Sequence, residues 1–370
     1  MIDKIPYPIQ LVQPDGRRVH RPDYARLVAD VDSDALRALY RDLVVTRRID
    51  TEAIALQRQG ELGLWAPSTG QEAAQVGSAR ALEPDDYAFI SYREHGVAYC
   101  RGVDPASMTR MWRGCALSGW NPDSVGVTNP AIVVGAQSLH ATGYAMGAHL
   151  DGVDIATISY FGDGATSQGD TAEAMVFARS LDAPVVFFCQ NNQWAISEPV
   201  ALQSPVPIAG RAAGHGIPSV RVDGNDVLAV LAVTREATRR ARDGGGPGFI
   251  EAITYRMGPH TTSDDPTRYR SAAETEAWRS RDPILRMQRL LEREELWSEE
   301  FDGQVRDTAD LVARQMRTGT LDAPDPVPAS LFDHVYTEHH PLVAAEKAEY
   351  TAYLDGFGTQ QFGTRQEVLS

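Results

Sequence analysis

Two apolar runs on either side of a glycine-rich segment lie near the centre of the chain. Residues 153–161 (VDIATISYF) and 184–189 (PVVFFC) have the length and the continuous apolar character of buried strands. Between them stands GDGATSQGD, and the residues from Gln168 to Leu181 have helical character. The order strand, tight loop, helix, strand predicts a right-handed βαβ unit whose two strands lie parallel in a covered sheet.

The alternation of strand-like and helix-like segments continues beyond this unit. Ser219 to Val222 and Phe249 to Tyr255 read as strands, and a helix is predicted between them from about Asp226 to Arg242. Repeated βα alternation is typical of layered α/β proteins. The predicted fold class is therefore α/β, with a doubly wound parallel sheet.

The segment that precedes this region has two parts. Residues 1–32 mix prolines, charges and isolated apolar residues without a period, which predicts an arm lying on the main body or on another subunit. From Ser33 apolar residues recur at helical spacing, so a Ser33/Asp34 cap is expected to begin an amphipathic helix. This helix should run towards Gln59 and stop at Gly60.

Residues 256–282 interrupt the rhythm with Gly, Pro, Thr, Ser and Asp over a length that is uncommon for a connector, which predicts a functional, mobile loop. Two charged amphipathic helical segments follow, at about 273–295 and 299–317. The predicted division is an N-terminal arm with the start of the first helix (1–35), an α/β domain (36–325) and a C-terminal tail (326–370).

Composition and charge exclude several classes of protein. The 370 residues exceed the size of one hydrophobic core, and the formal net charge of −15 disfavours nucleic acid binding. Three widely spaced cysteines suggest neither disulfides nor a zinc site. Without a signal-like N-terminus or a run of 18 apolar residues, the sequence predicts no membrane span and a cytoplasmic location.

The turn after the first strand contains a carboxylate where a phosphate-binding turn would be expected. Its glycines do not follow the GxGxxG spacing of a dinucleotide site, and Asp163 would repel a bare phosphate. A carboxylate directed at a diphosphate implies an intervening magnesium ion, which prefers oxygen ligands. Asn191 and Asn192 follow the next strand, 26 residues (165–190) after the GDG turn, so Asp163 and Asn192 are predicted to meet at one metal ion.

The spacing of GDG, 26 residues and NN resembles the thiamine diphosphate motif shared by transketolases and 2-oxo acid decarboxylases. Further segments resemble the α subunit of branched-chain 2-oxo acid dehydrogenase over roughly residues 36–340. They are YREHG at 92–96, FFCQNNQWAISEP at 187–199, RVDGNDV at 221–227 and EAITYRMGPHTTSDDPTRYR at 251–270. The resemblance implies a thiamine diphosphate-binding fold with Mg²⁺ as the bridging metal.

The resemblance also implies roles for individual residues. Those matched to the magnesium ligands are Asp163, Asn192 and the main-chain carbonyl of Trp194, a position usually held by tyrosine; those matched to cofactor binding are Tyr92, Arg93, Val134, Gly164, Ala165, Gln190, Asn192 and His260. Gln190 departs from the arginine of the branched-chain enzymes, so one charged contact with the diphosphate is expected to be missing. The stretch NPAIVVGAQ at 129–137 lacks the polar residues of a potassium site, so no potassium is predicted.

Histidines are the candidate catalytic side chains. His260 matches a loop histidine that helps to bind the diphosphate and is implicated in acyl transfer to a lipoyl group. His95 and His140 are further candidates, with structural roles equally open. Thr261 occupies the position of a serine that mitochondrial relatives phosphorylate, and threonine there puts that regulation in doubt.

The resemblance implies decarboxylation of a 2-oxo acid only together with a β subunit, which supplies the glutamate that activates the cofactor. The expected assembly contains two α and two β chains and transfers acyl groups to the lipoyl domain of a dihydrolipoamide acyltransferase. Branched-chain substrates are favoured over pyruvate, the substrate of pyruvate dehydrogenase, and over the chemistry of acetoin dehydrogenase. An NAD-dependent oxidoreductase and a catalytically silent scaffold subunit are the alternatives from other classes.

Overall fold

The computed structural model describes residues 8–116 and 118–357, and it is built on one parallel sheet of five strands in the order β1-β2-β3-β7-β6. A two-stranded antiparallel ribbon, β4 with β5, follows β3. The strands are β1 (Tyr87–Phe89), β2 (Thr157–Gly162), β3 (Val185–Asn191), β4 (Trp194–Ala195), β5 (Glu198–Pro199), β6 (Ser219–Asp223) and β7 (Gly248–Ile253).

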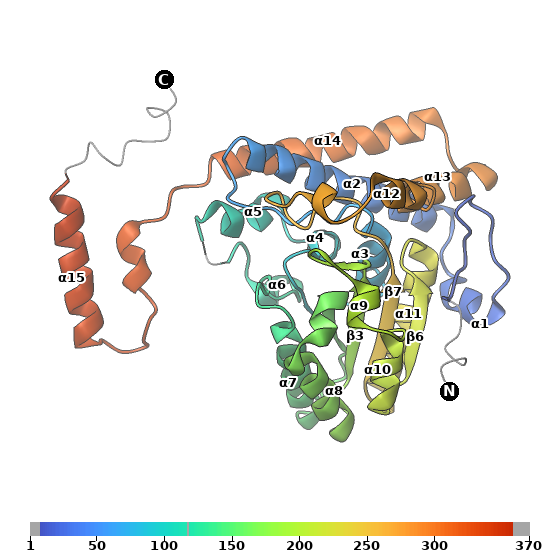
Figure 1. Ribbon diagram of the computed structural model, residues 1–370, viewed down its shortest axis with the longest axis horizontal. Helices are drawn as coiled ribbons and strands as arrows, with labels where there is room; N and C mark the ends of the chain where they lie inside the picture. The colour runs from blue at the N-terminus through green and yellow to red at the C-terminus, as the bar shows by residue number, and fades with distance from the viewer. Residues whose placement is uncertain (1–7, 117, 358–370) are drawn as a thin grey trace.

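Helices connect and cover these strands (Figure 1). The α-helices are α1 (Pro22–Ala25), α2 (Ser33–Arg58), α3 (Glu72–Ala79), α4 (His95–Cys100), α5 (Pro105–Arg113), α6 (Pro122–Val125), α7 (Ala136–Leu150), α8 (Gly169–Ser180), α9 (Val200–Gln203), α10 (Ala209–Gly214), α11 (Val227–Arg240), α12 (Ala272–Arg279), α13 (Pro283–Arg293), α14 (Glu299–Leu321) and α15 (Pro341–Asp355). Short 3-10 turns lie at Arg26–Val28, Asp163–Ser167, Pro266–Arg268 and Pro328–Phe332, and a π-helical turn follows α11 at Ala241–Gly245.

The central strand β3 shows why its sequence is apolar without interruption. All seven of its residues are buried, and successive side chains enter opposite layers of the core. Val186 and Phe188 belong to the cluster that includes α3 and α11, whereas Phe187 and Cys189 belong to the cluster that includes α7 and α8. Helices therefore cover both faces of the sheet.

The βαβ prediction at the centre of the chain is confirmed, with a shifted start. The first strand begins at Thr157 rather than at residue 153, because its partner β1 begins to pair only there. The residue before it is held instead by a carboxylate, since the Ala156 N–H donates to Asp86 Oδ1 at 2.9 Å. The predicted strands at 184–189, 219–222 and 249–255 correspond to β3, β6 and β7.

Two predictions of helix boundaries were wrong. The cap of α2 is Asp32, whose extended backbone lets its side chain accept the Ala35 N–H at 2.9 Å, and Ser33 already belongs to the helix. The segment 273–295 is two helices, α12 and α13, because Pro283 has no N–H to continue a helix and Asp282 caps the second one. Part of the predicted loop 256–282 is therefore helix α12.

The described part of the N-terminal segment lies on the main body, beside the outer strand β6. The Ile9 N–H donates to Arg221 O at 2.8 Å, and Asp223 N–H donates to Ile9 O at 2.9 Å. Asp226 Oδ2 then accepts the N–H groups of both Leu11 and Val12. These bonds cover the edge of the sheet that would otherwise be open.

The C-terminal segment stands apart from the body, at the end of the long axis opposite to the N-terminal segment (Figure 1). Its 3-10 turn and α15 contact each other through the rings of Phe332 and Tyr350 and through an ion pair of Lys347 with Asp333 at 2.6 Å. Residues 1–7 of the predicted arm and 358–370 of the predicted tail lie outside the described residues. No helix in the described ranges is long and apolar enough to cross a membrane.

Glycine is required at position 70, where the segment before α3 lies close to the residues that follow β7. Its φ is +93°, and an added Cβ would lie 2.3 Å from Tyr255 O. We expect Gly70→Ala to lower the free energy of unfolding by more than about 3 kcal/mol, since it adds a backbone clash to the strain of a left-handed alanine. Gly102→Ala is the matched control, because its φ is +94° and nothing lies within 4 Å. Equal losses in urea unfolding would contradict the close-approach argument.

Candidate functional site

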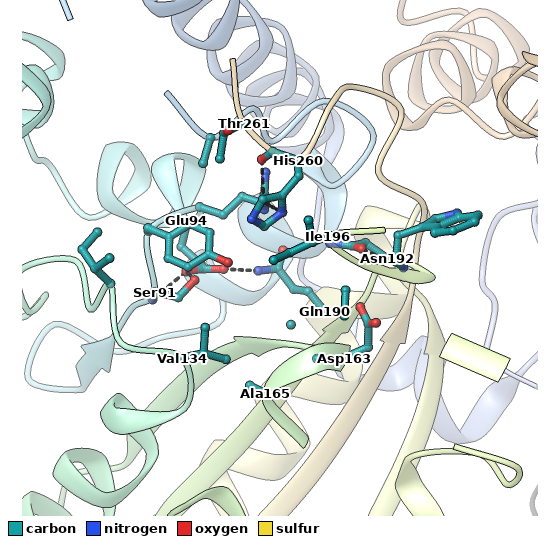
Figure 2. Close-up of a pocket in the computed structure, with 18 of the residues that line it drawn as sticks. Ser91, Glu94, Val134, Asp163, Ala165, Gln190, Asn192, Ile196, His260 and Thr261 are labelled. Atoms are coloured by element: carbon teal, nitrogen blue, oxygen red, sulfur yellow. Dashed lines mark hydrogen bonds between the residues drawn. The ribbon is translucent and has the colours of Figure 1, made fainter. Parts of the chain in front are cut away.

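A cavity of about 430 Å³ opens at the carboxyl ends of the central strands. In a parallel sheet all these ends meet at one edge, which is where open α/β sheets bind ligands. Asp163 follows β2 and Asn192 follows β3, and these two strands pair directly. Figure 2 shows Asp163 and Ala165 on one side of the cavity and His260 and Thr261 on the other.

Most of the residues predicted from the sequence are brought together in this cavity. Those that line it are Tyr92, Arg93, Val134, Asp163, Gly164, Ala165, Gln190, Asn192, Trp194 and His260. They come from five separate parts of the chain, so only the fold places them side by side. Their roles in binding remain predictions, and their placement makes those roles geometrically possible.

The carboxylate of Asp163 is buried, and few neighbouring groups stabilise its negative charge. Its side chain is 1% exposed, and among the described side chains only Gln203 donates to it, at 3.4 Å. Burial raises the pKa of Asp163 to about 6, against the lowering effects of backbone hydrogen bonds, including one from Asn192, and of the charge of Arg256. Such a carboxylate is suited to ligating a cation, which would supply the missing charge.

Asn192 and Trp194 present oxygen atoms beside Asp163. Asn192 Nδ2 donates to Gln71 Oε1 at 3.1 Å, and Asn192 Oδ1 accepts the Trp194 N–H at 3.2 Å. Trp194 O accepts from Arg256 Nη1 at 3.2 Å. The described residues contain no group of three or more His, Cys, Asp or Glu side chains placed to hold a metal ion. A cation here would therefore be held by Asp163 and by neutral protein oxygens, to which a magnesium diphosphate would add phosphate oxygens.

The fit of a diphosphate can be tested on the polar atoms of the cavity wall. Three buried glutamines line it, and each has one carboxamide atom without a partner in the described structure: Gln71 Nε2, Gln137 Oε1 and Gln190 Oε1. Buried polar atoms are almost always hydrogen-bonded in the functional state. The cavity wall therefore fits a polar ligand. Gln71 Nε2 can donate to an anion and the Asp163 carboxylate can hold a cation, whereas Gln137 Oε1 and Gln190 Oε1 can only accept from donor groups of the ligand.

His260 is held between two arginines. Arg93 Nη2 contacts His260 Nδ1 at 3.1 Å and His260 O at 2.9 Å, and Arg256 Nη1 approaches the same Nδ1 at 3.4 Å. A guanidinium only donates, so Nδ1 is the acceptor and the proton of a neutral ring is on Nε2. Burial, followed by the two arginine charges, lowers the pKa of His260 to about 3. At neutral pH the ring is therefore uncharged.

The loop around His260 is fixed by a hydrogen-bond network of its own residues. Arg256 Nη2 donates to Ile196 O and to Tyr269 Oη, and Tyr269 Oη donates to Asp264, which also accepts the His260 N–H. Arg270 donates to the carbonyls of Arg256, Met257 and Gly258. Because Arg256 also holds Trp194 O, the loop and the predicted metal site share one side chain.

Gln190, which was predicted to contact the diphosphate, donates through Nε2 to Glu94 Oε1. The other oxygen of Glu94 accepts from Ser91 N and Ser91 Oγ. Burial raises the pKa of Glu94. Sequence reasoning did not single out Glu94, although it stands inside the YREHG segment beside Tyr92 and Arg93.

His95 and His140 are not among the described residues that line the cavity. His95 is buried, stacks on Trp65 with ring centroids 3.9 Å apart, and bonds through Nε2 to Ala66 O at 3.0 Å. Burial lowers the pKa of His95 to about 3. His140 lies on α7 with an exposed side chain. Thr261 does line the cavity, next to His260.

Asp50 is a buried carboxylate behind the cavity that sequence reasoning missed. It accepts from Trp65 Nε1 at 2.7 Å, Ser68 N at 2.9 Å, and both Thr69 N and Thr69 Oγ1. The segment that it holds supplies Pro67 O to Arg93 and Trp65 O to the Thr262 N–H. Asp50 therefore supports both Arg93 and the His260 loop without lining the cavity.

Burial raises the pKa of Asp50 to about 6 from its ordinary value of 3.8. Because the folded state favours the protonated acid, the contribution of Asp50 to stability is fully present below pH 3.8 and is lost as the pH rises through 6. Between pH 4 and pH 7, the free energy of unfolding of the wild type should fall by about 2 kcal/mol more than that of Asp50→Asn. Chemical denaturation at both pH values measures this, and parallel curves for the two proteins would refute it.

Residues 40–315 match the family described as the dehydrogenase E1 component, and the chain belongs to that family. This is the decarboxylating component of a 2-oxo acid dehydrogenase, as the sequence resemblance predicted. The chain is 47% identical, over 348 residues and 94% of both chains, to the 3-methyl-2-oxobutanoate dehydrogenase subunit alpha of Mycobacterium tuberculosis. It is 39% identical over 322 residues, 86% of both chains, to the pyruvate dehydrogenase E1 component subunit alpha of Bacillus cereus, and 42% identical over 278 residues, 75% of both, to that of Bacillus subtilis.

Proposed function

We propose that this chain is the α subunit of a branched-chain 2-oxo acid dehydrogenase and that it binds thiamine diphosphate through Mg²⁺ in a doubly wound thiamine diphosphate-binding domain. The observation behind the cofactor assignment is the meeting of Asp163 and Asn192 at the ends of β2 and β3, in a cavity where Gln71 Nε2 is a buried donor without a partner. The observation behind the substrate is the higher identity to a 3-methyl-2-oxobutanoate dehydrogenase subunit than to the pyruvate dehydrogenase subunits above.

The residues divide the work of holding the cofactor. Asp163, Asn192 and the carbonyl of Trp194 would ligate the magnesium ion, and Arg93 and Tyr92 would contact the diphosphate. Gly164 and Ala165 bring main-chain groups to the same place, and Val134 lies on the opposite wall, where its carbonyl would meet the aminopyrimidine. When bound, thiamine diphosphate supplies the electron sink for decarboxylation.

His260 is the candidate hydrogen-bond donor to the reacting groups during acyl transfer to a lipoyl group. Its Nδ1 is occupied by arginine donors, so its Nε2–H is the group available to the cavity. The two arginines beside it orient the ring and keep it neutral. They therefore fix a hydrogen-bond donor that does not depend on pH near neutrality.

A β subunit is proposed to cover the mouth of the cavity and to supply the activating glutamate. Ile132, Val133 and Ile196 are 53%, 71% and 56% exposed, and the first and third line the cavity itself. Exposed apolar residues around a functional cavity are typical of a surface that a partner covers. We propose an assembly of two α and two β chains that acylates the lipoyl domain of a dihydrolipoamide acyltransferase.

Three alternatives predict different outcomes. Pyruvate dehydrogenase or acetoin dehydrogenase would share the cofactor site and differ in substrate. An NAD-dependent oxidoreductase would bind NAD without magnesium, and a silent scaffold would tolerate loss of Asp163. The turn after β2 favours enzymes that bind thiamine diphosphate over an NAD-dependent oxidoreductase, because a buried carboxylate stands where an NAD pyrophosphate would approach.

The substrate assignment is tested with the assembled α and cognate β chains. We expect release of carbon dioxide from 3-methyl-2-oxobutanoate with a higher kcat/KM than from pyruvate when thiamine diphosphate and MgCl₂ are present. Equal or better turnover of pyruvate would overturn the substrate assignment and leave the cofactor assignment intact.

A further inference from the structure

Three buried carboxamides face the cavity, and they differ in which atom is free. The side chains of Gln71, Gln137 and Gln190 are 0%, 2% and 1% exposed. Gln137 and Gln190 each use Nε2, on Tyr160 O and Glu94 Oε1, and leave an oxygen free. Gln71 uses its oxygen and leaves Nε2 free. Of these three, only Gln71 has an Nε2 without any hydrogen-bond partner.

The orientation of Gln71 follows from its neighbours. Gln71 Oε1 accepts Asn192 Nδ2, and Asn192 Oδ1 in turn accepts the Trp194 N–H. Turning the Asn192 amide over would set its NH₂ against the Trp194 N–H, and turning Gln71 over would set two NH₂ groups against each other. The backbone N–H of Trp194 therefore fixes both amides, and Nε2 of Gln71 is the end left for a ligand.

The two arginines beside the cavity already use their terminal nitrogens. Arg93 donates through Nη1 to Pro67 O and through Nη2 to His260. Arg256 donates to Trp194 O, Ile196 O and Tyr269 Oη. A diphosphate only accepts hydrogen bonds, so it binds where donors are uncommitted. The Nε2 of Gln71 is such a donor, available to an anion beside Asn192.

The backbone around Gln71 is firmly held, so its side chain is anchored for this task. The Gln71 N–H donates to Ser68 O at 2.9 Å, and Gln71 O accepts the Gln75 N–H at 3.2 Å as the cap of α3. Ser68 is itself bound to Asp50. A side chain on so rigid a segment positions its amide at little entropic cost.

We propose that Gln71 is a further cofactor-binding and positioning residue: its Oε1 holds the Asn192 carboxamide in the orientation that ligates the metal, and its Nε2 donates to a diphosphate oxygen. This inference rests on the proposed binding of thiamine diphosphate.

The test uses the assembled α and β chains and calorimetric titration with thiamine diphosphate in MgCl₂. Gln71→Glu keeps an acceptor for Asn192 but replaces the donor by a carboxylate oxygen, and Gln71→Leu removes both groups. We expect each variant to raise the Kd for thiamine diphosphate by at least about tenfold, the size of a lost hydrogen bond to a charged group. At saturating cofactor, the MgCl₂ concentration for half-saturation should rise in Gln71→Leu and not in Gln71→Glu.

Thr234→Val is the matched control, because Thr234 Oγ1 is also buried without a partner but lies on α11, outside the cavity lining. It should leave both constants unchanged. If both Gln71 variants bind thiamine diphosphate with the Kd of the wild type, the proposed role of Gln71 is overturned and the proposed function is not affected. Failure of the wild type to bind thiamine diphosphate would instead overturn the proposed function. If Gln71→Leu does not fold, Gln71→Glu still decides the donor role.

Discussion

Asp163→Ala is expected to abolish magnesium-dependent binding of the cofactor. Residues that only support a metal ligand typically change metal affinity by 10- to 100-fold when they are replaced, so loss of a ligand should cost more than about 100-fold. The measured quantity is the concentration of thiamine diphosphate and MgCl₂ that gives half-maximal decarboxylation by the assembled α and β chains.

The free protein should tolerate this substitution. Burial raises the pKa of Asp163 to about 6, so its ionised form opposes folding as the pH rises from 3.8 through 6. Alanine removes that cost, and the melting temperature of the cofactor-free variant at pH 7 should be no lower than that of the wild type. Asp154→Ala, at an exposed position shortly before β2, is the matched control for binding. If the half-maximal concentrations of thiamine diphosphate and MgCl₂ are unchanged in Asp163→Ala, Asp163 is not a metal ligand.

His260→Ala is expected to separate the two halves of the reaction. Acyl transfer to a lipoyl domain should fall by about 100-fold or more, the usual size of a lost hydrogen-bond donor to charge that develops in a transition state, whereas decarboxylation measured with an artificial electron acceptor should fall far less. His339→Ala, an exposed histidine in the C-terminal segment, is the control. Equal losses in both half-reactions would show that His260 acts only in cofactor binding.

The neutral state of His260 adds a pH test to the same variant. Because burial and Arg93 lower its pKa to about 3, the ring remains uncharged from pH 8 down to pH 5. The ratio of acyl transfer in the wild type to that in His260→Ala should therefore be constant over this range. A ratio that changes with a midpoint near 6.5 would show that the ring titrates and that the two arginines do not hold it neutral.

The parts of the fold with a local pattern could be predicted from the sequence. The continuous apolar run of β3 gave a buried central strand, because both its faces are covered by helices. Boundaries were less predictable where a side chain acts across the structure. Asp86, from a distant segment, holds Ala156 and delays the start of β2, and no pattern near residue 156 indicates this.

In the candidate site, too, some residues could be predicted from the sequence and others could not. Asp163 and Asn192 could be paired in advance, because each directly follows a strand and parallel strands end at one edge. Asp50, Glu94 and Gln71 could not, because each acts by hydrogen bonds to segments that only the folded chain brings near. His95 had a promising sequence context but became part of the packing around Trp65. Motifs therefore located the candidate ligands, and the structure was needed to find the residues that hold them in place.

The most direct test of the account is calorimetric titration of thiamine diphosphate into the assembled α and β chains, with MgCl₂ and then with a chelator in its place. We predict one thiamine diphosphate bound per α chain with magnesium, and binding weakened by more than about 100-fold when the metal is removed. Binding of NAD without magnesium, or thiamine diphosphate affinity that the chelator leaves unchanged, would contradict the assignment of Asp163 and Asn192 as ligands of a metal-bridged diphosphate.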